Sequence, residues 1–186
     1  MKKILLLITL LICSVFSYSQ SKVNFMGIPV EGSLKSVSNK IENKGFNKAS
    51  RGGRFLTGNF GGKPATIYIA SPNNMDIVYA IMVTFDPHIS WKGLHTEYLL
   101  FIKMFTQKYG ECSSTSSSFE SDYDYEGREL SLVRDGKSLF ISMWDLSDGF
   151  MSISITKNCE VELVYYNNMQ YEVIKNTLQK EILNDI

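Results

Sequence analysis

Short apolar segments separated by turn sequences dominate the second half of this 186-residue chain. The turns lie at four places: Glu126-Gly127, Asp135-Gly136, Asp148-Gly149 and Lys157-Asn158. They separate five runs with strand character: 117–125, 129–134, 138–145, 150–156 and 159–166. An Asp-Gly pair between two such runs is a strong hairpin signal, because both residues tolerate the positive φ of tight turns. Strands joined in this way pair antiparallel, so the pattern predicts an antiparallel sheet.

The first half follows a similar plan, in which one helix precedes several strands. Ser33 is a good N-cap, Val37 and Ile41 follow at helical spacing, and Gly45 is suited to end the helix. Strand patterns then cover 54–60, 64–70 and 76–85. Apolar residues occupy both faces of 76–85, which predicts a central strand covered on both sides.

A second and longer helix is expected between the two groups of strands. Its apolar stripe recurs at steps of three or four residues and stops at Gly110, and a further helix is expected over 169–186. The stripe consists of Trp91, Leu94, Tyr98, Phe101, Ile102, Phe105 and Tyr109. The sequence therefore predicts an α+β fold of tandem helix-then-antiparallel-strands units, with the helices packed on a curved antiparallel sheet.

The first nineteen residues have the composition of a secretory signal peptide. Lys2 and Lys3 precede an apolar run over 4–12, and the small residues Ser17 and Ser19 come before a cleavage point at Gln20. We expect an exported protein, periplasmic or secreted, with halves at 20–89 and 90–186 in one compact domain. The alternative is a lipoprotein anchored through Cys13, which the bulky residues before that cysteine disfavour.

Two cysteines remain after the expected cleavage, Cys112 and Cys159. An even number of cysteines in an oxidising compartment favours a disulfide between them. The alternative is a pair of buried free thiols, since sequence spacing does not bring two Cα atoms within reach.

Composition argues against several classes of partner. Loss of Lys2 and Lys3 leaves a slight excess of acidic side chains, whereas proteins that bind nucleic acid usually carry an excess of basic ones. No apolar run is long enough for an integral membrane span. The two histidines, His88 and His95, have no metal-ligand spacing, so no metal or cofactor is expected. No nucleophile elbow of the Gly-x-Ser-x-Gly type occurs.

The segment 120–126 carries the most distinctive polar pattern. As a strand, it would place four carboxylates on one face and Tyr123 and Tyr125 on the other. Such a row could hold Ca²⁺ or meet a basic partner, or it could be a solvated outer face that discourages aggregation. The four carboxylates are Glu120, Asp122, Asp124 and Glu126.

Four turn and helix-end motifs carry a resemblance to known proteins: Gly27-Ile28-Pro29-Val30, Lys44-Gly45-Phe46, Gly58-Asn59-Phe60-Gly61-Gly62 and Lys108-Tyr109-Gly110. With these motifs the chain resembles a family of uncharacterised exported bacterial proteins, and its tandem plan resembles the β-lactamase-inhibitor-protein-like fold. The resemblance implies a binding surface on the sheet and no active-site residue.

The resulting functional expectation is a non-enzymatic binding or interaction module of the bacterial envelope, whose partner is a protein, a peptide or a glycan. The candidate binding residues are Tyr123, Tyr125 and Trp144, because aromatic side chains are favoured at interfaces. One alternative is a hydrolase that uses Asp122, Asp124 or Asp145 as paired carboxylates. Another is an accessory of outer-membrane assembly.

Overall fold

A computed structural model describes residues 21–49, 53–120 and 126–184 of the chain. The helices of this part are α2 (Leu34–Glu42), α3 (Trp91–Tyr109), α4 (Glu129–Arg134) and α5 (Asn168–Asn184). The first strands are β1 (Asn24–Phe25), β2 (Ile28–Pro29), β3 (Asn47–Lys48), β4 (Phe55–Phe60), β5 (Lys63–Ala70) and β6 (Ala80–Phe85). The remaining strands are β7 (Ser114–Phe119), β8 (Ser138–Leu146), β9 (Gly149–Ile155) and β10 (Val161–Asn167).

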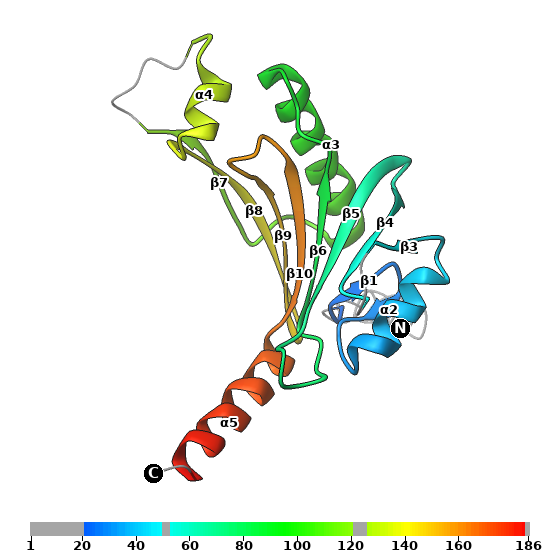
Figure 1. Cartoon of the computed structure of the whole chain (residues 1–186). Coiled ribbons are helices and arrows are strands. Elements are labelled where there is room, and N and C mark those ends of the chain that lie inside the picture. The colour runs from blue at the N-terminus through cyan, green and yellow to red at the C-terminus, as the bar shows by residue number, and fades with distance from the viewer. Residues whose placement is uncertain (1–20, 50–52, 121–125, 185–186) are drawn as a thin grey trace, which may run out of the picture.

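Eight of the strands form one antiparallel sheet in the order β3-β4-β5-β6-β10-β9-β8-β7 (Figure 1). Strands β3 to β6 come from the first half of the chain and β7 to β10 from the second, and the last strand of each group pairs at the centre of the sheet. The α+β class with helices on an antiparallel sheet, predicted from the turns and stripes, is confirmed.

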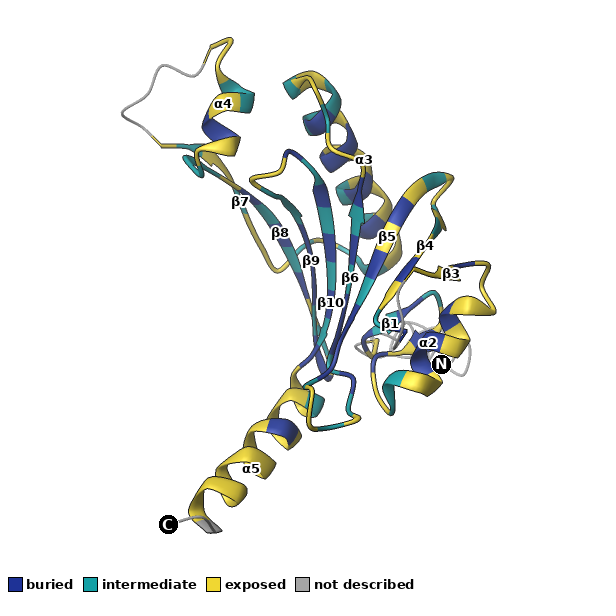
Figure 2. Cartoon of the chain, viewed as in Figure 1, coloured by how far each residue is buried: buried dark blue, intermediate teal, exposed yellow. Residues whose placement is uncertain are grey.

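The long helix α3 packs on the central strands of the sheet through its apolar stripe. Leu94, Tyr98, Phe101 and Phe105 are all buried, and α3 ends at Gly110, as the sequence predicted. On the same side of the sheet, the β1–β2 hairpin inserts Phe25, whose ring lies against Phe46, Phe60 and Tyr165. Helices and hairpin therefore enclose a core on one face of the sheet (Figure 2).

The segment 129–134, expected as a strand, is the helix α4. Leu132 and Val133 are adjacent and both buried, which fits a helix turn and not a half-buried strand. Gly136 has φ 72° and its N–H donates to Val133, so Asp135-Gly136 ends a helix and is not a hairpin turn.

The strand expected over 76–85 is shorter than predicted and is covered on one side only. Asp76 leaves the sheet to accept the N–H of Leu34 at the start of α2, at 2.7 Å, so β6 begins at Ala80. β6 lies at the centre of the sheet, but Met82 and Thr84 face the side without helices and stay partly exposed.

The disulfide predicted between Cys112 and Cys159 does not form, because both cysteines are free. Cys112 follows the C-terminal cap of α3, whereas Cys159 accepts the N–H of His88 just before that helix begins. The two residues therefore lie at opposite ends of a helix about 28 Å long, far beyond the reach of a disulfide.

Candidate binding surface

The face of the sheet opposite α3 is not covered by any helix among the described residues. Strand alternation directs one set of side chains into the core and the other set to this side, where large apolar side chains lie among polar ones such as Thr66, Thr84 and Ser154. We call this surface the open face and define it by Phe55, Tyr68, Met82, Leu139, Ile141, Met143, Phe150, Val164 and Tyr166.

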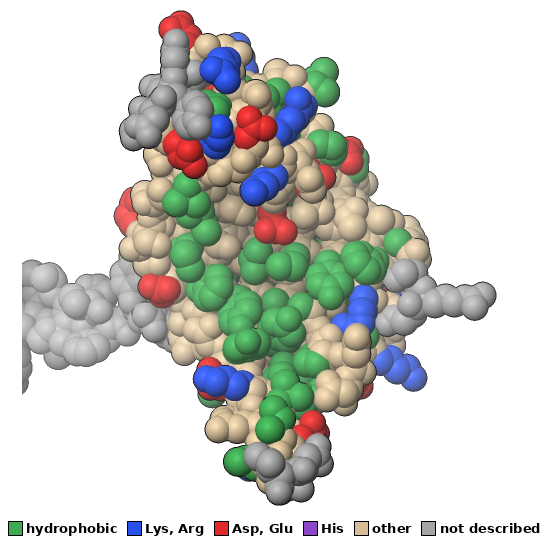
Figure 3. Space-filling model, turned by 60° about the vertical axis from the view of Figure 1, so that its left-hand side comes forward, with side chains coloured by type: hydrophobic (Ala, Val, Ile, Leu, Met, Phe, Trp, Pro, Cys, Tyr) green, Lys and Arg blue, Asp and Glu red, His purple; other side chains and the backbone are tan. Residues whose placement is uncertain are grey.

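Strand register aligns these side chains in rows that cross the sheet. One row runs from Tyr68 through Met82, Val164 and Ser152 to Met143, each opposite the next on its neighbouring strand. Figure 3 shows hydrophobic side chains gathered into one patch that continues from the middle of the sheet toward the C-terminal helix. The patch is therefore a property of the whole sheet and not of a single strand.

Aromatic rings cluster where the open face meets the start of α5. Tyr166 stacks on Phe150 with ring centroids 5.0 Å apart, and it lies 5.7 Å from both Tyr79 and Tyr171. Burial raises the pKa of the Tyr166 hydroxyl above its ordinary value, and the neighbouring Tyr171 and Tyr79 add to the effect. The Tyr166 hydroxyl therefore stays protonated at neutral pH and remains a hydrogen-bond donor.

Two carboxylates lie on the same side of the sheet as this patch. Glu162 is half-buried on the central strand β10, and burial raises the pKa of its carboxyl, with a smaller contribution from Glu160. Asp145 is exposed on β8. The side chains opposite Glu162 on the neighbouring strands, Thr84 and Ser154, are uncharged, and a partly desolvated charge is costly unless a partner supplies a donor or a cation.

The structure tests one of the three sequence-predicted binding residues, Trp144, and contradicts the prediction for it. Tyr123 and Tyr125 lie outside the described residues. Trp144 is only 2% exposed, on the core side of β8, where its indole N–H donates to the carbonyl of Gly110 at 2.9 Å. The open face is therefore defined without Trp144. The sequence separated Phe140 and Trp144 from Ile141 and Met143, but alternation alone does not say which set faces α3.

A polar cluster that the sequence did not reveal lies at the N-terminal part of α3. The carboxylate of Glu97, 5% exposed, pairs with Lys63 at 2.7 Å and with Nε2 of His88 at 2.7 Å. Two shallow cavities of about 180 and 420 Å³ adjoin these three residues. The pairs join α3 to the start of β5 and to the segment before α3, so they anchor the helix on the sheet.

The cluster has part of the geometry of a catalytic dyad, since a carboxylate holds an imidazole by one nitrogen. Ser90 is the hydroxyl nearest to His88 in sequence, but its Oγ accepts the N–H of Gly93 as the N-cap of α3. That role satisfies an orphan backbone donor of the helix. The cluster is therefore explained as an anchor of α3.

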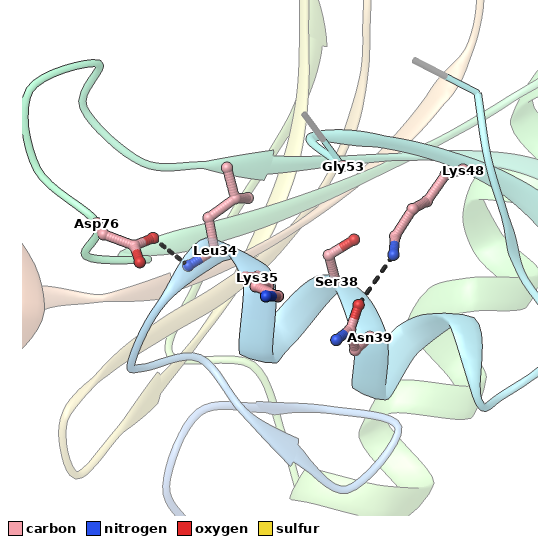
Figure 4. A pocket seen from close by; sticks show the side chains of 7 residues that line it. All are labelled: Leu34, Lys35, Ser38, Asn39, Lys48, Gly53 and Asp76. Atoms are coloured by element: carbon pink, nitrogen blue, oxygen red, sulfur yellow. Dashed lines mark hydrogen bonds between the residues drawn. The ribbon is translucent and has the colours of Figure 1, made fainter. Parts of the chain in front are cut away.

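A third concave region lies beside α2 and has a volume of about 400 Å³ (Figure 4). Its polar groups bind one another: Lys48 donates to Asn39 at 2.9 Å and also pairs with Glu42 at 3.0 Å. The exception is the buried Oγ of Ser38, which lacks a hydrogen-bond partner. One unpaired hydroxyl in an otherwise self-satisfied cleft defines no ligand chemistry.

The described residues contain no group of three or more histidine, cysteine, aspartate or glutamate side chains placed to hold a metal ion. Within the same part of the chain, no helix combines the length and the apolar character that crossing a bilayer requires.

Comparison of the chain with family models found no match. Comparisons with curated proteins and with solved structures found none either. The resemblance carried by the turn motifs therefore stays a prediction, and the function has to be inferred from the geometry of this molecule.

Proposed function

We propose that this protein is an exported, non-enzymatic binding module and that the open face of its sheet is the binding surface. The observation that supports this proposal is the uncovered apolar face itself. Antiparallel sheets with one solvated face normally present polar side chains there, in alternation with the core residues. Here Met82, Val164 and Met143 occupy positions where that pattern would place polar residues.

The size of the open face fits a recognition surface. Each outward side chain occupies about 4.8 by 7 Å of the sheet, so the nine residues that define the open face cover roughly 300 Å². An apolar patch of this order is comparable to the largest patches on monomeric proteins, and such patches are often functional. Burial of apolar area contributes a favourable free energy of about 25 cal/mol per Å², so covering the open face would favour association substantially.

The chemistry of the face favours a protein or peptide partner over a glycan. Methionine and aliphatic side chains give adaptable apolar contact but no directional bonds to sugar hydroxyls. Tyrosine adds large rigid contact area with a polar tip, as in many protein interfaces. The row of side chains from Tyr68 to Met143, in which only Ser152 is polar, suits contact with the apolar side of a partner's helix or strand.

A carboxylate-dependent hydrolase has less support. Asp122 and Asp124 lie outside the described residues. By register, Asp145 lies opposite Phe150, which lies opposite Tyr166, four residues along β10 from Glu162. The two carboxylates are thus about 16 Å apart, beyond the roughly 5–10 Å that paired catalytic carboxylates use.

Site-specific photo-crosslinking in the native cells tests the proposal. A benzophenone amino acid replaces Tyr68 or Met143 on the open face, and the matched control replaces Lys103, exposed on the outer side of α3. We expect irradiation to give a discrete crosslinked protein from both face positions and none from the control. Crosslinks that are absent at both face positions, or equally strong at Lys103, would refute the proposal.

A further inference from the structure

The C-terminal helix α5 extends away from the rest of the molecule (Figure 1). Over 168–183, where the burial of α5 is described, only Ile174 is buried, and the residues from Lys175 to Leu183 are all exposed. Helices of this length gain most of their stability in proteins from packing an amphipathic side. In the chain as described, the outer half of α5 has no such packing.

α5 nevertheless carries an apolar stripe suited to packing. Tyr171, Ile174, Leu178 and Ile182 recur at steps of three or four residues and so lie along one side of the helix. We call these four residues the α5 stripe. Leu178 is 36% exposed and Ile182 63% exposed, so the stripe loses its cover as the helix leaves the sheet.

The α5 stripe and the open face form one continuous apolar surface. Tyr171, the first residue of the stripe, lies 5.7 Å from Tyr166 on the open face and 5.5 Å from Tyr79. Figure 3 shows the hydrophobic patch extending from the sheet onto the helix. One chain thus presents an uncovered helix side and an uncovered sheet face, which meet at the aromatic side chains of Tyr166, Tyr171 and Tyr79.

The helix has no connection that would let it fold back over its own sheet. β10 ends at Asn167 and α5 begins at Asn168, with no loop between them. The Asn167 side chain fixes this junction, because it donates to the carbonyl of Val30 at 3.0 Å and accepts the N–H of Gln170 at 3.1 Å. Reversal of α5 onto its own open face would require this junction to unfold.

We propose that α5 of one copy lies across the open face of a second copy, and that the exchange is reciprocal in a symmetric dimer. This inference depends on the proposed function of the open face as a binding surface and names its partner. A contact of this kind is isologous, so it closes at two subunits and covers the α5 stripe and part of the open face of each copy.

The dimensions allow the exchange. The exposed part of α5, residues 175–183, is about 14 Å long, and a sheet of eight strands is about 34 Å wide, so this part of the helix fits within the open face. A helix about 10 Å wide then buries roughly 140 Å² on each of the two surfaces. Two reciprocal contacts bury about 560 Å² in all, which is the size of a weak, transient interface.

Charge is compatible with the same arrangement. Lys175 borders the α5 stripe and engages only an exposed i, i+3 pair with Glu172, at 3.5 Å. The open face offers the half-buried carboxylate of Glu162. A lysine brought to that carboxylate from a second copy would supply the counter-charge that the sheet itself does not place beside it.

Sedimentation equilibrium of the purified exported chain tests the proposal. The stripe variant is Leu178→Glu, and the matched control is Asn176→Glu, the same charge on the opposite side of the same helix. Both positions are exposed and glutamate is a good helix former, so both variants keep the fold. We expect a dimer for the unmodified chain and the control, and a dissociation constant at least about tenfold higher for Leu178→Glu.

A mixing experiment distinguishes helix exchange from other dimers. The face variant Met82→Glu/Met143→Glu, folded by circular dichroism, keeps an intact helix, while Leu178→Glu keeps an intact face. At a concentration where the unmodified chain is a dimer, each variant alone is expected to be mostly monomeric. A mixture of the two is expected to form heterodimers, because the intact helix of the face variant can still bind the intact face of Leu178→Glu.

Two results would overturn the proposal. One is a dimer that Leu178→Glu does not weaken, and the other is an unmodified chain that stays monomeric up to high micromolar concentration. In the second case, a photo-crosslink from Tyr68 to a different protein would preserve the proposed binding function and reject only the second copy as its partner. Loss of all crosslinks from the open face would reject both.

Discussion

Replacement of Asn167 by alanine is expected to destabilise the junction between the sheet and α5. The side chain is 2% exposed, and it donates to the buried residue Val30 at 3.0 Å and to Asp148 at 3.4 Å. Its carbonyl oxygen accepts the N–H of Gln170, which is the N-cap interaction of α5.

The magnitude follows from these partners. Loss of an N-cap costs about 1 kcal/mol, and a buried carbonyl left without its donor costs about 1–3 kcal/mol. We therefore expect the free energy of unfolding to fall by about 2–4 kcal/mol. At about 2–4 °C per kcal/mol for a domain of this size, the Tm should fall by roughly 5–15 °C.

Urea and thermal denaturation followed by circular dichroism measure this effect. The matched control is Asn168→Ala, the same substitution at the adjacent, exposed position. The control should change the free energy of unfolding by less than about 0.5 kcal/mol. Equal effects at Asn167 and Asn168, or a loss below about 1 kcal/mol at Asn167, would refute the assignment of Asn167 as the residue that fixes α5.

Three further predictions follow from the described residues. Because burial raises the pKa of Glu162, the folded state favours its neutral form and stability is lost as pH rises, so Glu162→Gln should raise the Tm at pH 7 but not below about pH 4. Trp144→Ala should lower the free energy of unfolding by about 3–5 kcal/mol in urea titrations, since it removes a buried ring and the donor to Gly110; a loss below about 1 kcal/mol would contradict its core position. Thiol labelling of the native protein should modify the partly exposed Cys112 well before the buried Cys159, and an intact mass lower by two hydrogen atoms would instead indicate the disulfide.

Local sequence signals predicted the helices α2, α3 and α5 and the class of the sheet, but not the helix α4. The α3 stripe and its stop at Gly110, the N-cap at Ser33 and the strand pattern of 150–156 all depend on residues a few positions apart, and the structure confirms them. These features could be predicted because helix caps, periodicity and tight turns are decided within one or two turns of chain.

The sequence-based predictions that were wrong concern features that depend on contacts between distant residues. Asp135-Gly136 ends α4 and Asp148-Gly149 is a hairpin turn, and the dipeptide alone does not distinguish them. The positions of Cys112 and Cys159 at opposite ends of α3 follow from tertiary packing.

The candidate site was only partly visible in the sequence. The alternation in β8 separated its two sides, but only the placement of α3 shows that Trp144 faces inward and Met143 outward. The ion pairs of Glu97 with Lys63 and His88 join three separate segments, so no local pattern could indicate them.

Methionine oxidation in intact cells tests the central claim most directly, because the chain supplies its own controls. Met82 and Met143 lie on the open face, Met104 is 44% exposed on α3, and Met151 is buried in the core. If the open face is a binding surface, Met82 and Met143 should be oxidised readily in the dilute purified protein but protected in cells, while Met104 reacts equally in both. Equal oxidation of Met82 and Met143 in cells and in dilute solution would contradict the claim.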